Sequence, residues 1–548
     1  MANEVPMTET RGGSGLVLAT LAAGQFVMTL DSSVMNVSMV EVAKDVGSDI
    51  TGIQTAITAY TLVMAALMIT GGKVGQIIGP KRAFMIGCVI YATGSLTTAL
   101  AHSLPVLLLG WSLLEGIGAA LILPALVALV AANFPTEERP KAYGLLAASG
   151  AVAIAIGPLI GGLCTTYLSW RVVFVGEVVL VALILVLARR MQAAAPDPTV
   201  RLDVPGTVMS AAGLALFVFG VLRSGVWGFL RAKDGTPELF GLSAAFWSMF
   251  AGVVMLWIFF AWERRVVAAG REPLVDPALF EIRQLKAGLG AFFFQFLVQG
   301  GLFYLVALFL TVALGLTAIA TGMRLMPLSF ALLAAAVGIP KLFPKASPRR
   351  VSRIGFLLLI GAIVLLIALL GQGTGAAVVA VPLLLAGLGV GCLASQLGAV
   401  VASSVPDERT GEVGGLQNTA TNIGASIATA LAGAVLIAAL TTSLTDNLTN
   451  NPAVPPAVLE QAQVQLSAGV PFVSDAQLGG ALEQAGVPDD LASAITRSNA
   501  EARVSALRTS LALLALLGVL ALFATGRIPD VAAGRANPAD ERRPQPVQ

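Results

Sequence analysis

The stretch Gly150-Ala-Val-Ala-Ile-Ala-Ile-Gly157-Pro158-Leu-Ile-Gly161-Gly162 lies in the middle of a long apolar segment. At about 100° of helical rotation per residue, Gly150, Gly157 and Gly161 share one face, on which another helix can pack closely. Pro158 removes one backbone hydrogen bond, so we expect a local bend. A smooth, bendable face inside an apolar segment predicts a moving joint, although small residues also serve in the ordinary packing of membrane helices.

The composition of the whole chain excludes a soluble globular protein. Of its 548 residues, 56% are hydrophobic and only 12% are charged, and the mean hydropathy is +0.85. The formal net charge of +2 gives no reason to expect nucleic acid as a partner. The sequence shows no phosphate-binding loop, no Ser/His/Asp set and no group of metal ligands, so we predict neither an enzyme nor a cofactor.

Apolar stretches long enough to cross a bilayer of about 30 Å number about fourteen. Their centres lie near residues 26, 62, 93, 115, 155, 180, 214, 252, 300, 328, 362, 388, 428 and 515. An even number of spans puts both termini on one side of the membrane. Lys and Arg are about three times more frequent on that side, which predicts a multi-pass plasma-membrane protein with both termini in the cytoplasm.

An internal repeat divides the spans. Glu138-Arg139-x4-Gly144 follows span 4, and Glu408-Arg409-x4-Gly414 follows span 12. Both sites align if spans 9 to 14 repeat spans 1 to 6, so we predict an all-α membrane protein with two six-helix bundles and two inserted helices. The predicted parts are a cytoplasmic tail (1–14), an N-terminal bundle (15–190), two linker helices (204–262), a C-terminal bundle (286–527) with an external segment (441–503), and a disordered cytoplasmic tail (528–548).

The external segment 441–503 separates the last two spans. Val458–Leu466 and Asp475–Ala485 have the pattern of short amphipathic helices. The segment is either a cap outside the membrane or a passive tether.

Charged residues inside membrane spans are costly, which makes the few present candidates for function. Counting residues from the span ends puts Asp31 and Glu115 at comparable depth, and we predict that they form a proton-coupling site, since a low-dielectric cavity favours the neutral form of a carboxyl group. Glu177 is close enough along its helix to Arg171 to predict a structural ion pair. Arg324 either balances the acids across a cavity or extends towards the membrane surface.

The predicted substrate pocket combines aromatic, amide and methionine side chains. Gln295 and Gln299 share one helix face with Phe292, which suits a flat, hydrophobic or cationic molecule. Methionine-rich walls adapt to many shapes. The predicted substrate-binding residues are Met28, Met35, Tyr60, Phe292, Gln295, Gln299, Asn418 and Asn422.

These motifs resemble the fourteen-helix drug/proton antiporter family of the major facilitator superfamily, across residues 15 to 527. Leu30-Asp31-Ser-Ser-Val-Met-Asn36-Val resembles that family's first-helix signature, in which the Asp takes part in coupling. The stretch from Gly150 to Gly162 resembles its antiporter motif, which distinguishes exporters from importers. The segment from Gly72 to Arg82 resembles the superfamily's cytoplasmic latch between the two halves, with Gly72, Gln76, Gly79, Lys81 and Arg82 at the motif positions.

Two positions depart from the family pattern. Gln76 stands where an acid is usual, which implies a neutral latch. Ser112 replaces an Arg associated with proton handling, and Glu115 replaces a Gln. The loss of a cation beside the gain of an acid implies either that Glu115 has taken over part of the proton handling or that coupling differs in this chain.

The resemblance and the residues together predict a monomeric plasma-membrane exporter that moves hydrophobic drugs or biocides, cationic ones included, in exchange for protons by alternating access. Its partners are then small hydrophobic substrates, protons and the lipid bilayer. The glycine face of 150–162 is expected where the two bundles meet. The alternatives are a dedicated exporter of one natural product or lipid, a nutrient importer, and a transport-dead receptor or scaffold that binds through residues 441–503.

Overall fold

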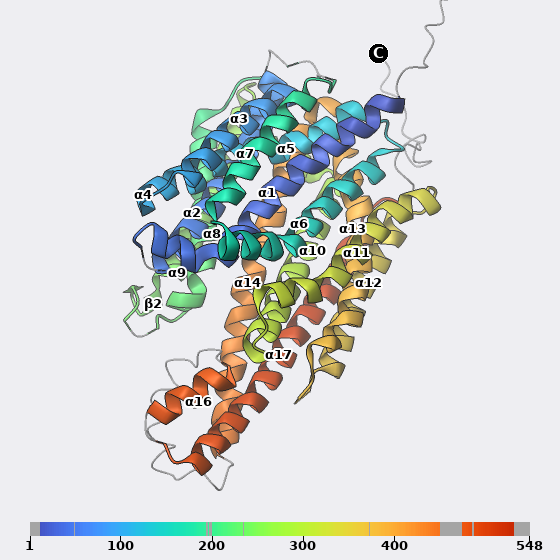
Figure 1. The fold of residues 1–548 in the computed structure, drawn as a ribbon. Helices are drawn as coiled ribbons and strands as arrows, with labels where there is room; N and C mark the ends of the chain where they lie inside the picture. The colour runs from blue at the N-terminus through green and yellow to red at the C-terminus, as the bar shows by residue number, and fades with distance from the viewer. Residues whose placement is uncertain are drawn as a thin grey trace, which may run out of the picture.

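The structure, a computed structural model, describes residues 11–48, 50–192, 196, 200–233, 235–371, 373–449, 474–484 and 487–530. This part of the chain is almost entirely helical (Figure 1). The predicted tails and the predicted helix Val458–Leu466 lie largely or wholly outside it.

The N-terminal bundle contains the helices up to residue 188. They are α1 (Arg11–Asp45), α2 (Ile50–Ile78), α3 (Pro80–Ala99), α4 (Leu104–Leu107) continued by the π-helix η1 (Leu108–Glu115) into α5 (Gly116–Asn133), α6 (Arg139–Tyr167) and α7 (Arg171–Ala188). Within the bundle α1 packs on α6, and α3 packs on α5 and α7. Gly79, at φ 90°, makes the sharp turn between α2 and α3, and Pro80 then starts α3.

Two further helices follow, α8 (Val204–Trp227) and α9 (Ala244–Ala268), which pack against each other. Between them β1 (Glu238–Leu239) and β2 (Leu242–Ser243) form a short antiparallel hairpin. Asp203 caps α8 and Ser243 caps α9, each by accepting a hydrogen bond from a backbone N–H of the first turn. α8 also contacts α2 and α14, so this pair lies against both bundles.

The C-terminal bundle contains the remaining long helices. They are α10 (Arg283–Leu308) continued by η3 (Phe309–Ala313), α11 (Ala318–Leu342), α12 (Pro348–Leu369), η4 (Ala376–Val379) leading into α13 (Ala380–Ala402), α14 (Thr410–Thr449), the short α16 (Asp475–Gln484) and α17 (Asp489–Thr525), with the 3₁₀ turns η2 (Pro277–Glu281) and η5 (Asp407–Arg409) before α10 and α14. α13 packs between α11 and α12, and α14 packs on α10 and α17.

Thirteen helices in the described part are long and apolar enough to cross a membrane. Each predicted span coincides with a long helix, but α3 is not among the thirteen; its second half carries the polar run Gly-Ser-Leu-Thr-Thr at 94–98. The chain is a multi-pass, all-α membrane protein. The exact number of spans and the side on which the termini lie remain predictions.

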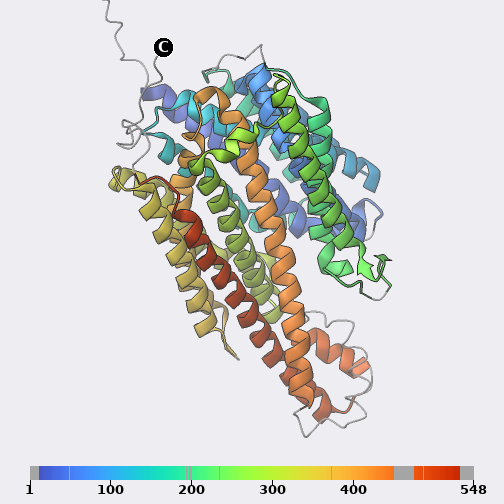
Figure 2. The same cartoon turned by 180° about the vertical axis from the view of Figure 1, so that it is seen from behind.

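The two bundles meet along α2, α5 and α6 of the first and α11, α13 and α14 of the second. α6 packs on α11 and α13, and α14 packs on α2 and α5. Figures 1 and 2 show that α14 and α17 extend far from the N-terminal bundle at the ends that lie next to α16. The bundles therefore approach each other closely at one end and diverge towards the other.

The segment 441–503 is mostly helical where the structure describes it. The predicted helix at Asp475–Ala485 is confirmed as α16 (Asp475–Gln484). Arg503 on α17 forms an ion pair of 2.5 Å with Asp475, and Asn447 on α14 donates to the Ser498 carbonyl at 3.2 Å. The first contact holds α16 against α17, and the second joins the extended ends of α14 and α17.

Candidate functional site

Three acidic side chains meet inside the N-terminal bundle. Asp31 comes from α1, Glu115 from the last residue of η1 and Glu177 from α7. One carboxyl oxygen of each lies within 4.8 Å of those of the other two. Their exposed fractions are 0%, 0% and 1%. We call this group the acid triad.

Neutral donors hold one oxygen of each acid. Trp111 Nε1 donates to Asp31 Oδ1 at 2.7 Å, and Thr98 Oγ1 donates to Glu115 Oε1 at 3.0 Å. Tyr91 and Ser95 donate to Glu177 Oε2 at 3.1 and 2.9 Å. The second oxygen of each carboxyl group, namely Asp31 Oδ2, Glu115 Oε2 and Glu177 Oε1, is buried without a hydrogen-bond partner in the described protein.

Local backbone features make room for these acids. Glu115 ends a π-helical turn, a distortion that is frequent at functional sites. α3 and η1 approach closely at Gly94 and Gly110; a Cβ atom at Gly94 would lie 2.7 Å from Glu115 Cγ, and one at Gly110 would lie 2.7 Å from the Thr98 amide nitrogen. Glycine at both positions therefore lets the Glu115 side chain reach the interior.

Electrostatics prevent all three acids from being ionised together. Two carboxylates whose oxygens lie within 4.8 Å of each other repel by at least about 3.5 kcal/mol at an effective dielectric constant of about 20, and three such pairs repel by at least about 10 kcal/mol. Protonating one isolated carboxyl group at pH 7 costs only about 4 kcal/mol. Since burial adds a further penalty for each charge, protonation relieves more energy than it costs.

The predicted ion pair between Glu177 and Arg171 is wrong. Arg171 pairs instead with Asp45 at the end of α1 and also donates to the Ala101 carbonyl. Hydrogen bonds from Trp170 and Arg171 hold the pKa of Asp45 below its ordinary value. Glu177 points into the bundle instead, where it joins the other two acids.

A central cavity of about 170 Å³ lies between the two bundles. Four of the predicted substrate-binding residues line it: Phe292, Gln295, Gln299 and Asn418. Gly150 of the glycine-rich stretch lines it too. Further lining side chains include Gln25, Thr29, Tyr143, Phe296 and Gln417, and no charged side chain is among the residues described at this cavity.

The cavity wall presents hydrogen-bond acceptors. The amide oxygens of Gln295, Gln299 and Gln417 are buried without a partner in the described protein. In contrast, Asn418 Nδ2 and the Tyr143 hydroxyl already donate to backbone carbonyls, at 2.9 and 3.0 Å. The wall thus suits a molecule that donates hydrogen bonds or carries positive charge.

The other four predicted pocket residues do not line this cavity. Met28 and Met35 are buried in the hydrophobic packing of the N-terminal bundle. Tyr60 stacks on Trp111 with ring centroids 5.0 Å apart, beside the acid triad. Asn422 Nδ2 lies 3.3 Å from Met68 Sδ, where α14 meets α2.

Arg324 lies on α11, in the opposite bundle from the acid triad. Its side chain is exposed, and in the described part of the chain no ion pair joins it to an acid. The predicted role in charge balance therefore remains a proposal.

The glycine face of α6 packs on α1. A Cβ atom at Gly157 would overlap the side chain of Ser33, and one at Gly161 would lie 3.3 Å from Val34 Cα. The expectation of an interface between the bundles is wrong for these positions. It holds at Gly150, which lines the central cavity between the bundles, and at Gly162, where a Cβ atom would lie 3.6 Å from the Ile319 side chain of α11. The glycine face thus supports the part of α1 that carries Asp31.

Close contacts join the bundles at one end. A Cβ atom at Gly72 of α2 would lie 2.5 Å from the Gly411 carbonyl oxygen of α14, so the two backbones touch. Arg139 at the start of α6 donates to both oxygens of Asp407, at 3.0 and 2.8 Å. The charge distribution predicts that this end faces the cytoplasm.

The predicted latch residues contribute to this end in different ways. Gln76 lines a space beside Asp407 and Gly411, and its amide oxygen is buried without a described partner. Gly79 forms the turn described above, and Lys81 Nζ donates to the carbonyls of Arg189 and Met191, at 2.8 and 2.7 Å, within the same bundle. Arg82 is exposed.

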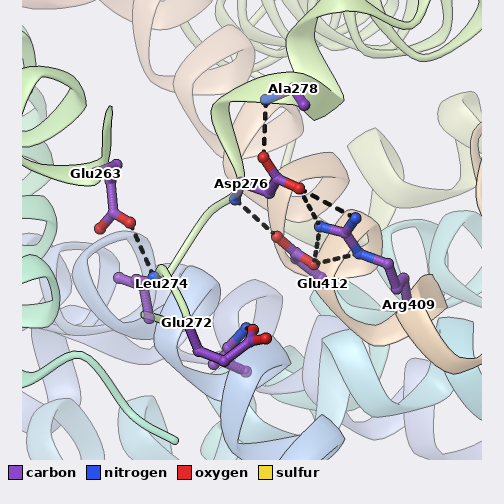
Figure 3. Close-up of polar contacts among 8 residues, drawn as sticks. Glu263, Glu272, Leu274, Asp276, Ala278, Arg409 and Glu412 are labelled. Atoms are coloured by element: carbon purple, nitrogen blue, oxygen red, sulfur yellow. Dashed lines mark hydrogen bonds and ion pairs between the residues drawn. The ribbon is translucent and has the colours of Figure 1, made fainter. Parts of the chain in front are cut away.

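We call the end at which Arg139 binds Asp407 the closed end. The chain between α9 and α10 also crosses this end (Figure 3). Arg409 binds Asp276 at 3.2 Å and Glu412 at 3.0 Å, and Glu412 Oε1 accepts the Asp276 backbone N–H. Glu263 Oε2 accepts the Leu274 N–H at 2.9 Å. On the other bundle, Lys73 lies 3.7 Å from Glu272. Residues 271–276, here called the linker strap, therefore contact α2, α9 and α14 at once.

Two bundles around a central cavity, with buried acids in one bundle and a closed end held by ion pairs, define a polytopic membrane transporter. The chain belongs to the Major Facilitator Superfamily, whose family model matches residues 21–429. Membership of this family makes it a transporter and not an enzyme.

Several relatives are antibiotic resistance or export proteins. The chain is 30% identical to the puromycin resistance protein of Streptomyces alboniger, covering 74% of this chain and 78% of that protein. It is 31% identical to the cephamycin export protein of Amycolatopsis lactamdurans, covering 76% and 86%. A multidrug resistance protein of Mycobacterium tuberculosis is 26% identical, covering 75% and 73%.

Solved structures support the fold. The human organic anion transporter MFSD10 superposes with a TM-score of 0.56 at 13% identity, covering 93% of this chain and 99% of that one. A bacterial homologue of the lysosomal transporter Spinster gives 0.52 at 16% identity, covering 95% and 98%.

The sequence interpretation missed several residues of these sites. Glu177 was assigned to a structural pair, and the Arg139–Asp407 contact was not predicted. The repeated Glu-Arg-x4-Gly motif was the signal for the second case, because it marks Arg139 and Arg409, and both form ion pairs at the closed end.

Proposed function

We propose that this transporter exports hydrophobic compounds, cationic drugs and antibiotics included, across the plasma membrane in exchange for protons. The relatives named for resistance and export support the direction of transport. Substrate binds in the central cavity, and the two bundles then rock to expose it on the other side.

The chemistry of the cavity supports this substrate class. Aromatic rings and apolar side chains provide most of its wall, and Phe292 and Phe296 supply faces on which a cation can rest. The free amide oxygens of Gln295, Gln299 and Gln417 can accept hydrogen bonds from ammonium or hydroxyl groups. A wall without basic side chains disfavours anionic substrates.

The arrangement on α1 supports proton coupling through Asp31 and Glu115. Thr29 lines the cavity, and Asp31 lies two residues further, on nearly the opposite face of the same helix. A change in the charge of Asp31 therefore acts on the helix that forms part of the substrate wall. This position of α1, between cavity and acids, is the single observation that carries the proposal.

Expression in a host that lacks its own pumps tests the proposal. We expect resistance to cationic dyes and hydrophobic antibiotics, lower cellular accumulation, and loss of both effects when a protonophore is added. Unchanged accumulation with and without the transporter contradicts export, and efflux that persists with the protonophore contradicts proton coupling.

A dedicated exporter of one natural product is the second candidate, because two of the relatives are named for a single antibiotic. A panel of dyes, biocides and antibiotics separates the two. Protection against one chemical class favours the dedicated exporter, and protection against several unrelated classes favours the multidrug exporter.

A further inference from the structure

Glu177 occupies a position that the proposed function leaves unexplained. It comes from α7, carries no ion pair in the described structure, and has a carboxyl oxygen within 4.8 Å of one from each of the two acids assigned to proton coupling. A buried acid with a purely structural role is normally paired with a cation or fully hydrogen-bonded. Glu177 has neither, since its Oε1 has no described partner.

The groups that donate hydrogen bonds to the acid triad, within the described part of the chain, are all neutral. The titratable groups nearest to it are the hydroxyls of Tyr60 on α2 and Tyr91 on α3, and the donors are Trp111, Ser95 and Thr98. Among the described residues, no Lys, Arg or His forms an ion pair with Asp31, Glu115 or Glu177. The negative charge is therefore compensated by bound protons or by a bound cation.

Two hydroxyl groups point to protons. Thr98 Oγ1 lies 2.9 Å from the Gly94 carbonyl oxygen and 3.0 Å from Glu115 Oε1. Ser95 Oγ lies 3.4 Å from the Phe174 carbonyl oxygen and 2.9 Å from Glu177 Oε2. A hydroxyl has a single proton, so it serves only one of its two acceptors at a time. When it donates to the carbonyl, a protonated glutamic acid completes the pair by donating to the hydroxyl oxygen.

We propose that Glu177 joins Asp31 and Glu115 in one proton-binding unit, and that this unit holds at least two protons in the conformation seen here. The count follows from the short separations, at most 4.8 Å between the carboxyl oxygens, because only one of the three acids can be ionised without placing two negative charges side by side in the interior. The protons come from the outer solution and leave to the cytoplasm when the opposite side opens. The inference rests on the proposed function, whose two coupling acids it extends to three.

Proton release and substrate transport in proteoliposomes test the inference. The purified protein, reconstituted with a pH-sensitive dye and a fluorescent cationic substrate, gives the number of protons exchanged per substrate. The comparison uses the wild type, Glu177→Gln, Glu177→Asp and Glu238→Gln, a matched control that makes the same change at an exposed glutamate on β1.

We expect Glu177→Gln to lower the proton count by about one per substrate and to shift the pH profile of transport, while Glu177→Asp restores both towards the wild type. Ser95→Ala, which keeps all three acids but removes a neutral partner of Glu177, should shift the pH profile without lowering the proton count. Glu238→Gln should match the wild type.

The failures are distinguishable. If a pH gradient drives the wild type and Glu177→Gln with the same proton count and pH profile, the inference is overturned and the proposed function stands. If the wild type does not respond to a pH gradient, proton coupling itself fails. If a sodium gradient at constant pH drives export instead, the triad binds an inorganic cation, and the proton assignment is wrong. A Glu177→Gln variant that fails to fold leaves the Glu177→Asp and Ser95→Ala measurements to decide.

Discussion

Arg139 of the N-terminal bundle holds Asp407 of the C-terminal bundle with two hydrogen bonds, of 3.0 and 2.8 Å, at the closed end of the transporter. Arg139 is nearly buried, and it also donates to the carbonyls of Phe134 and Ala131. This pair therefore links the first turn of α6 directly to η5, the turn that leads into α14. Opening that end requires the bond to break.

Asp407→Asn should favour the conformation that is open at this end, because it removes the charge of the pair and leaves the other Arg139 bonds intact. A half-exposed ion pair stabilises by about 1 kcal/mol, which corresponds to an approximately fivefold shift in population. Spin labels at Arg190 and Leu342, both exposed, would report the distance between the bundles at this end by pulsed electron resonance.

The matched control is Glu408→Gln, which removes the neighbouring exposed charge. It should leave the distance distribution unchanged. Equal distributions for the wild type and Asp407→Asn would show that the Arg139 contact does not hold the closed end.

The linker strap should loosen when Asp276 is replaced by alanine. This change removes the carboxylate that accepts from Arg409 and from the Ala278 N–H (Figure 3). We expect backbone hydrogen exchange in residues 271–276 to accelerate about fivefold, the effect of losing a partly exposed ion pair. Glu281→Gln, which changes an exposed acid on η2, is the control. Equal exchange in both variants would contradict the claim that Asp276 holds the linker strap.

The cavity predicts a selective loss of cationic substrates in Gln299→Leu. The change preserves the approximate size of the side chain but removes a buried amide oxygen without a protein partner. Losing one hydrogen bond to a charged ligand should weaken apparent affinity about tenfold, while neutral substrates change little. Dose–response curves for efflux of a cationic and a neutral dye give the change in apparent affinity for each.

Met35→Leu is the comparison for this prediction, since Met35 is fully buried away from the cavity. Its curves should match the wild type for both dyes. A similar loss for both dyes in Gln299→Leu would argue for a packing role of the glutamine.

Gly157→Ala should destabilise the fold, because Gly157 packs on α1 within the N-terminal bundle. The added methyl group overlaps the Ser33 side chain, and overpacking of this kind costs about 1–3 kcal/mol. Thermal unfolding of the purified protein should therefore shift to lower temperature. Gly176→Ala, at a position with no neighbouring atom within 4 Å, should not shift it, and Ser33→Gly should restore Gly157→Ala.

Hydropathy and charge asymmetry were sufficient to predict the positions of the long helices. A membrane helix must satisfy its backbone internally and be apolar over the bilayer thickness, so each segment carries its own signal. α3 shows the limit of this signal, because it is stabilised by burial of Gly94, Ser95 and Thr98 against other helices as well as by its own hydropathy.

The sites were harder to predict, because counting residues gives the depth of a side chain in the membrane but not the direction in which it points from its helix. Asp31 and Glu115 were expected at comparable depth, and the structure brings them within 4.8 Å. Glu177 was matched to Arg171 from their separation along one helix, yet the two side chains point to different partners. Met28 and Met35 failed as cavity residues for the same reason, since α1 turns Gln25 and Thr29 towards the cavity instead.

Proton-driven transport in proteoliposomes tests the central claim most directly. The relevant population is inserted with its cytoplasmic side facing out of the vesicle. With an acidic vesicle interior and a fluorescent cationic substrate outside, the wild type in this population should accumulate substrate inside as protons leave. Asp31→Asn should bind the substrate but lose accumulation against its gradient. Full, gradient-driven accumulation by Asp31→Asn, or accumulation by the wild type that is indifferent to the pH gradient, would contradict proton-coupled export.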